Sequence, residues 1–103
     1  MGPAEFEEHV RAALDLLPAD IAAKLENLVV IVEDENPEEP DLFGLFDEEP
    51  YMPARVTIYR VPLVEEFGDD VELLREEIQI TVLHEVAHYF GIDEQRLAEL
   101  GYD

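Results

Sequence analysis

The 103-residue sequence contains no cysteine and no tryptophan. Without cysteine, the chain cannot form disulfides, coordinate zinc through thiolates or use a cysteine as a nucleophile. A chain free of disulfides fits a reducing compartment, so we expect a cytoplasmic location.

Long apolar runs are also missing. No stretch approaches the roughly 20 consecutive apolar residues that a membrane-spanning helix requires. The first eight residues, MGPAEFEE, contain neither the basic segment nor the apolar run of a signal peptide. We therefore expect no membrane as a partner, which again favours the cytoplasm.

Basic residues are scarce. Six lysines and arginines stand against 27 aspartates and glutamates, and the formal net charge is −21. Such a surface repels the phosphate backbone of nucleic acids, so we expect no nucleic-acid partner. Three explanations for the charge stay open: a solvated surface suited to solubility or high salt, attraction of metal cations, and attraction of basic peptide substrates.

The length and the apolar content predict a single domain over residues 1–103, because a hydrophobic fraction of 48% is sufficient for a packed core. The apolar periodicity predicts an α+β fold in which a small, mostly antiparallel or mixed three-stranded sheet is flanked by helices. We expect helices over residues 3–17, 19–27, 71–90 and 92–101, and strands over residues 28–32, 41–47 and 55–61.

Two of the predicted strands carry further signals. Gly44, inside the strand over 41–47, indicates a bulge or a close approach of another part of the backbone. The strand over 55–61 alternates apolar and longer polar residues and stops at Pro62, which predicts a half-exposed strand at the edge of the sheet. Such an edge would hold an extended peptide by β-augmentation.

The most informative motif is HEVAHYFG at residues 84–91. Residues four apart on a helix share one face, so His84 and His88 can ligate one zinc ion while Glu85 lies close enough to take a water proton. Asp70 is placed to cap the start of this helix and Gly91 to end it in a left-handed conformation. The alternative interpretation is a pair of packed or exposed histidines beside a chance glutamate.

A catalytic zinc ion needs three protein ligands and one open position. In the extended pattern HExxHxxGxxH, the third ligand lies six residues after the second histidine, where this sequence has Glu94. We rank Glu94 first, although the helix dipole alone also favours an acidic residue there. Asp93 ranks second, because it also suits the N-cap of the following helix. Glu99 and His9 rank behind both.

Three ligands would complete a hydrolytic mechanism. The metal lowers the pKa of a water molecule, and Glu85 acts as the general base that takes the proton of this metal-activated water and later delivers it to the leaving amine. The motif therefore predicts hydrolysis of peptide bonds in a peptide or protein substrate.

Three segments carry a resemblance to a known family, namely residues 84–92 (HEVAHYFGI), 42–46 (LFGLF) and 56–63 (VTIYRVPL). Together they resemble the small bacterial metallopeptidase-like family with a minimal zincin fold. The similarity runs from about residue 6 to residue 101. It implies a small sheet of about three strands that is flanked by helices and bears a zincin-like site.

The resemblance also bears on the third ligand. In that family the residue after Gly-Ile-x is typically an aspartate, which is proposed to bind the metal. Here Glu94 occupies the matching position and Asp93 precedes it. The resemblance therefore implies a carboxylate ligand but leaves the choice between these two residues open.

Two further hypotheses compete with a zinc-dependent metallopeptidase. Only 15 residues follow His88, so we expect an open and shallow site, which loses the exclusion of water that strengthens electrostatic catalysis. A catalytically weak or inactive metal-binding or partner-docking protein of zincin shape is therefore the first alternative. The second is an acidic adaptor in which the histidines merely pack.

Overall fold

A computed structural model describes residues 1–17, 19–92 and 94–100, apart from the side chains of Asp20, Ile21, Glu94, Leu97 and Leu100. Within these residues the chain forms, in order, α1 (Pro3–Asp15), α2 (Ala19–Ala23), β1 (Leu28–Glu33), β2 (Gly44–Asp47), β3 (Ala54–Tyr59), α3 (Arg60–Phe67), α4 (Val71–Tyr89) and α5 (Glu94–Leu100). The first, second and fifth helices and the second strand are shorter than their predicted ranges.

The strands of the described residues form one mixed sheet in the order β1-β3-β2. β1 runs parallel to β3, and β2 runs antiparallel to it, with Val56 facing Val30 on one side and Phe46 on the other. The predicted α+β fold with a mixed three-stranded sheet and flanking helices is confirmed.

The prediction of an edge strand over residues 55–61 is wrong, because β3 is the central strand and has hydrogen-bonded neighbours on both sides. Its alternating pattern suggested exposure of one face. Thr57 on that face is nevertheless buried, since it pairs with Ile31 of β1 and Leu45 of β2. A peptide therefore cannot add to β3.

The same segment was predicted to remain extended up to Pro62, but α3 begins at Arg60. A proline in the first turn of a helix is compatible with helical structure, because the N–H groups there have no intrahelical acceptor. The N–H of Val61, in that turn, instead donates to the carbonyl of Asp34 over 2.8 Å.

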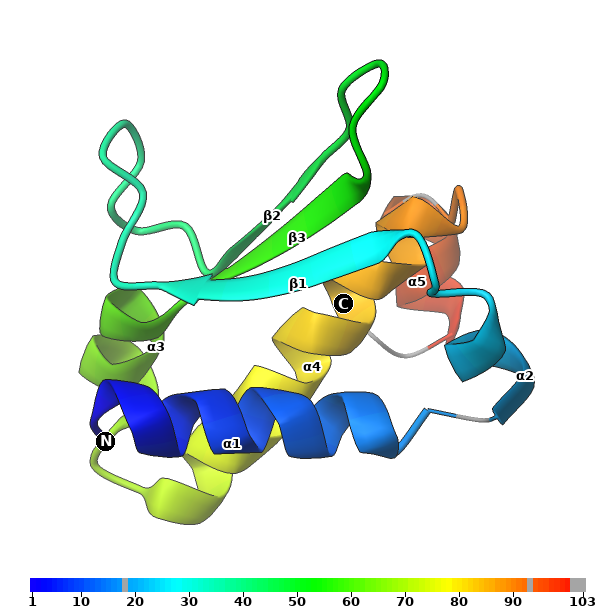
Figure 1. Cartoon of the computed structure of the whole chain (residues 1–103). Coiled ribbons are helices and arrows are strands. Elements are labelled where there is room, and N and C mark those ends of the chain that lie inside the picture. The colour runs from blue at the N-terminus through cyan, green and yellow to red at the C-terminus, as the bar shows by residue number, and fades with distance from the viewer. Residues whose placement is uncertain (18, 93, 101–103) are drawn as a thin grey trace.

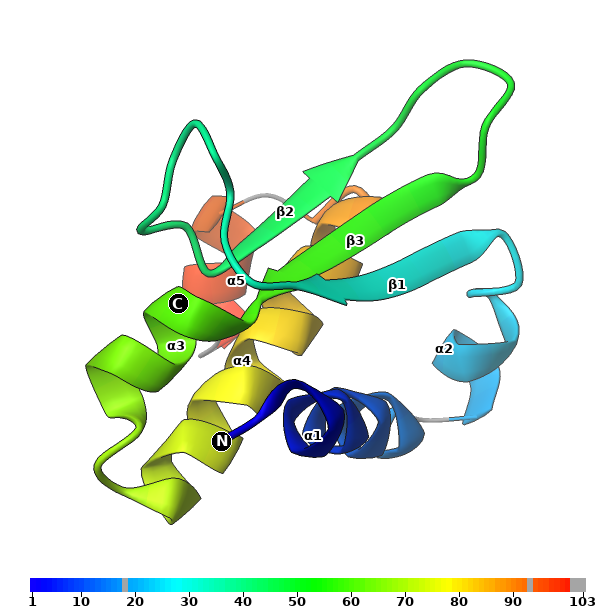
Figure 2. The same cartoon turned by 60° about the vertical axis from the view of Figure 1, so that its left-hand side comes forward.

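The helices α1, α3 and α4 cover one face of the sheet, and α4 runs beneath it (Figures 1 and 2). α4 contacts α1 and α3 as well as β2 and β3. The hydrophobic core consists of buried apolar side chains from α1, β3, α3 and α4. β2 contributes only Phe46, which is partly buried and packs against this core. The most completely buried are Phe6, Val56, Ile58, Leu63, Leu74, Ile78 and Val82.

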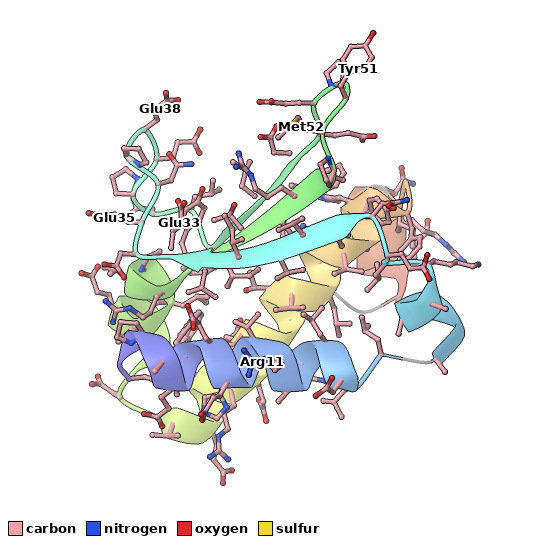
Figure 3. All side chains as sticks on the ribbon, in the orientation of Figure 1. Arg11, Glu33, Glu35, Glu38, Tyr51 and Met52 are labelled. Carbon is pink, nitrogen blue, oxygen red and sulfur yellow. The ribbon has the colours of Figure 1, made fainter. Side chains whose placement is uncertain are left out.

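Two loops rise on the side of the sheet that faces away from the helices. Figure 3 shows Glu35 and Glu38 on the loop after β1, and Tyr51 and Met52 on the loop between β2 and β3. These acidic side chains point into solvent and away from α4.

In the part of the chain that the structure describes, no helix is both long and apolar enough to span a membrane.

Both ends of α4 are fixed as the sequence predicts. The Asp70 side chain accepts hydrogen bonds from the N–H groups of residues 72 and 73, at 3.1 and 3.2 Å. At the other end, Gly91 has a φ of 76°, in the left-handed region. The Gly91 N–H donates to the carbonyl of His88, and the Ile92 N–H donates to that of Ala87, both over 3.0 Å. This pair of bonds is a Schellman motif, which satisfies two of the terminal carbonyls.

Candidate metal centre

The C-terminal half of α4 brings His84, Glu85 and His88 together. Their potential ligand atoms all lie within 4.8 Å of one another. The two imidazole ring centroids are 4.8 Å apart and their planes are inclined by 69°. The i, i+4 spacing on a regular helix produces this arrangement, because such residues lie one above the other on the same face.

Glu85 is the most enclosed member of this group. It is 7% exposed, whereas both histidines are half-buried. Its Oε2 lies 3.6 Å from Nδ1 of His88. A carboxylate is costly to remove from water unless polar groups surround it. Its position beside two imidazoles therefore indicates a functional cluster more than a packing role.

Gly44, the first residue of β2, allows the sheet to approach Glu85. A Cβ at Gly44 would lie 2.9 Å from Cγ of Glu85, 3.1 Å from Cγ2 of Thr81 and 3.4 Å from the carbonyl oxygen of Thr57. The Thr81 hydroxyl donates to the carbonyl of Glu77 over 2.8 Å, which fixes the side chain of Thr81 against this strand. The glycine was predicted to mark a bulge or a close approach of another part of the backbone, whereas its nearest neighbours are the side chains of Thr81 and of Glu85, the candidate general base.

A Gly44→Ala substitution is expected to disturb the site through this contact. The added methyl group must displace Glu85 or Thr81, so the free energy of unfolding should fall by about 1–3 kcal/mol. A displaced general base should also lower kcat/KM of any hydrolysis by about 10- to 100-fold. Denaturant unfolding and steady-state kinetics measure the two effects. Gly2→Ala is the control, because a Cβ there meets no atom within 4 Å, and equal behaviour of the two variants would contradict this role of Gly44.

Aromatic packing also joins this end of α4 to β2. The ring of Tyr89 lies edge-on to that of Phe46, with centroids 6.2 Å apart, and contacts Phe90 at 5.3 Å. The strand is thus in contact with α4 at Glu85 and again one turn later. The helix segment with the histidines is therefore held against the edge strand β2.

The structure places the other predicted ligands as follows. Asp93 lies outside the described residues, and Glu94 begins α5 but its side chain is outside them too. Glu99 accepts a hydrogen bond from Arg96 over 3.1 Å and is not in the group around His84, and neither is His9 of α1. The choice between Asp93 and Glu94 stays a prediction.

Sequence reasoning missed the structural role of Gly44 in holding Glu85, because a glycine signals a close approach without naming its partner. It also missed a cavity of about 300 Å³ that opens beside His84 and Glu85, between α4 and the chain entering β2. No local pattern marked this cavity, since its walls come from segments that are more than 30 residues apart.

The cluster has donors that suit a divalent metal. Imidazole nitrogens and carboxylate oxygens are the ligands that zinc takes in catalytic sites without cysteine. The half-buried histidines leave one side of the cluster accessible. The fit therefore rests on the chemistry and closeness of these donors.

A mixed sheet packed on a helix with this cluster defines a zincin-like fold. The sequence model of the family described as zincin-like metallopeptidase matches residues 25–102, and the chain belongs to that family. A comparison with curated proteins found no match. Family membership implies a divalent metal, usually zinc, and the candidate cluster lies within the matched residues.

Proposed function

We propose that this protein is a zinc-dependent metallopeptidase that hydrolyses peptide bonds with Glu85 as the general base. The observation that carries the proposal is the cluster of His84, Glu85 and His88, whose ligand atoms lie within 4.8 Å of one another in a chain of the zincin-like metallopeptidase family.

His84 and His88 are two of the proposed metal ligands, and Glu94 is the third, with Asp93 as its alternative. When bound, zinc supplies Lewis-acid chemistry: it acidifies water and polarises a carbonyl group. Two imidazoles on a capped, packed helix are well suited to hold such an ion, because the helix fixes their spacing on one face.

Glu85 is proposed to move the proton. Its carboxylate takes a proton from the attacking water and passes it to the nitrogen of the leaving amine, because an unprotonated amide nitrogen is a poor leaving group. Burial beside Gly44 limits the motion of the side chain and excludes water from one side of it. A positioned and partly desolvated base is more effective than a solvated one, because its geometry needs no reorganisation during the reaction.

The open edge of the sheet supports a peptide as substrate. The Tyr59 N–H donates to the carbonyl of Phe43 over 2.8 Å, so in an antiparallel pair Phe43 and Leu45 bond to β3. The backbone groups of Gly44 and Phe46 then point to the other side, where the described residues place no strand. An extended peptide that pairs with these groups would pass Glu85, which contacts Gly44.

The first test is metal content together with peptide cleavage. Protein purified without a chelator or a metal-affinity tag is reconstituted with zinc, dialysed and analysed by mass spectrometry, and cleavage of a peptide library is then measured. We expect about one equivalent of zinc per chain. Less than about a tenth of an equivalent would contradict the metal site and favour an adaptor with packed histidines.

The third ligand is tested by Glu94→Ala and Asp93→Ala. Loss of a direct ligand should weaken zinc binding by at least about 100-fold, whereas loss of a helix cap should cost only about 1 kcal/mol of stability. Zinc dissociation constants from competition with a chromophoric chelator, and denaturant unfolding without zinc, separate these effects. We expect the larger loss of affinity for Glu94→Ala, and the reverse order would assign the ligand to Asp93.

A further inference from the structure

The cavity of about 300 Å³ lies on the same side of α4 as the candidate metal centre. Glu77 and Ile80 line it from α4, seven and four residues before His84, and this spacing follows one face of the helix. Phe43 lines it from the chain that enters β2. Because His84 and Glu85 also border it, the cavity opens directly onto the proposed site of hydrolysis.

Most of the cavity wall is apolar. Phe43 and Ile80 contribute hydrocarbon surface. The hydroxyl of Thr81 is engaged with the helix carbonyl of Glu77 over 2.8 Å, so Thr81 has little polar capacity left for a ligand. The cavity therefore suits the aliphatic part of a side chain and offers it few hydrogen bonds.

Of the other polar residues that line the cavity, His84 and Glu85 belong to the proposed catalytic cluster, which leaves Glu77 as the charged group that can select a ligand. Glu77 is half-buried, and within the described residues no cation and no hydrogen-bond donor engages its carboxylate. Such a carboxylate attracts a cation more strongly than an exposed one, because water screens the charge less completely. The Glu77 carboxylate repels an anionic side chain. It also disfavours an apolar side chain of the same size, because that side chain would displace the water bound to the carboxylate without replacing its hydrogen bonds.

We propose that this cavity binds the side chain of a lysine or arginine that flanks the scissile peptide bond, and that Glu77 determines this specificity. The apolar walls cover the methylene groups and the Glu77 carboxylate pairs with the terminal cation. The inference rests on the proposed peptidase function, because it places this side chain next to the bond that Glu85 helps to cleave. The net charge of −21 favours the approach of such cationic peptides in general, and Glu77 supplies the local selection.

The test uses the zinc-loaded full chain and a series of quenched fluorescent peptides. The peptides are identical except on either side of the scissile bond, where they carry lysine, arginine, norleucine or glutamate. Norleucine keeps the aliphatic stem of lysine and removes the charge. We expect kcat/KM for the lysine and arginine peptides to exceed that for norleucine by about 10- to 100-fold at one of the two positions.

Glu77→Gln should reduce this preference to less than about threefold, and Glu77→Lys should reverse it in favour of the glutamate peptide. Glu76→Gln is the matched control: it removes one negative charge from the neighbouring, exposed position of α4 and should leave the preference unchanged. Repeating the series at about 0.5 M salt screens the general attraction between the acidic protein and basic peptides.

The outcomes separate this inference from the proposed function. Cleavage without a preference for lysine or arginine, or a preference that persists in Glu77→Gln, overturns the role of the cavity and leaves the peptidase proposal intact. If the wild type cleaves none of the peptides, the peptidase proposal fails, and dissociation constants for the same peptides then test whether the cavity binds a basic side chain. Equal dissociation constants for the lysine and norleucine peptides would overturn this role of the cavity. Tighter binding of the lysine peptide that disappears in Glu77→Gln would support it.

Discussion

Glu85→Gln is expected to lower kcat/KM for peptide hydrolysis by roughly 10³-fold, within the range that general acid–base groups contribute. Glutamine has nearly the same shape, so it keeps the contact with Gly44 and the fold, but its amide cannot accept the proton of water. Zinc content and the free energy of unfolding should stay close to those of the wild type. The measurement is steady-state cleavage of a peptide that the wild type hydrolyses, followed by chromatography.

The matched control for this change is Glu76→Gln, an exposed position of the same helix, which should retain full activity. If the wild type and Glu85→Gln share one background rate while both bind zinc, the protein is a metal-binding or docking protein of zincin shape and not a peptidase. A loss of zinc in Glu85→Gln would show instead that Glu85 helps to hold the metal.

His88→Ala is the second change with a large expected effect. It removes one of the two imidazoles on α4, so zinc affinity should fall by at least about 10³-fold and peptide cleavage should fall to background. Zinc at about 1,000 times its dissociation constant stabilises a folded protein by about 4 kcal/mol. The wild type should therefore show a clear zinc-dependent rise in Tm, and His88→Ala should show at most about a tenth of this stabilisation at the same zinc concentration.

His9→Ala provides the comparison for this experiment. His9 lies on α1 and is not in the cluster with His84 and His88, so its loss should leave the zinc-dependent rise in Tm unchanged. An unchanged zinc affinity in His88→Ala would contradict the metal site. A loss of affinity in His9→Ala would show that the N-terminal helix contributes a ligand.

The sequence predicted α4 well because its signals are local. Asp70 supplies a side-chain cap, Gly91 supplies the left-handed residue, and between them Leu74, Ile78, Val82 and Val86 recur every four positions along one buried side. The proximity of His84, Glu85 and His88 follows from the same period, so the centre of the candidate site needs no tertiary information. Boundaries of the shorter elements were less accurate, since helix and strand ends are set partly by contacts that the local sequence does not encode.

The position of β3 shows what local pattern cannot supply. Alternation says which side chains share a face, but the number of neighbouring strands depends on pairing with segments far along the chain. Arg55 and Thr57 belong to the same face, yet Thr57 is buried between its cross-strand neighbours while Arg55 is exposed. The helix α3 was missed for a different reason: Pro62 can end a strand or occupy the first turn of a helix, and the sequence permits both.

The surroundings of the cluster were the least predictable part of the site. Gly44 and Glu85 are 41 positions apart, and Phe43 is 34 to 42 positions from the residues of α4 that share its cavity. These contacts depend on where β2 docks against α4. The proposed catalytic residues on α4 thus lie in one short segment, whereas the proposed selectivity depends on the assembled fold.

The Schellman motif at the end of α4 makes the length of the following segment a constraint in its own right. Gly91 and Ile92 are bonded back to the last turn of the helix, and α5 begins two positions after Ile92. One residue inserted between Gly91 and Glu94 would change the spacing along the chain between the histidines of α4 and Glu94, the proposed third ligand. In the loop between β1 and β2, Asp34 and Phe43 make the contacts described above and lie at its two ends. Doubling the length of the loop between them would cost only about 0.6 kcal/mol. Insertions should therefore be tolerated between these two residues but should disturb the proposed metal site when they fall after Gly91.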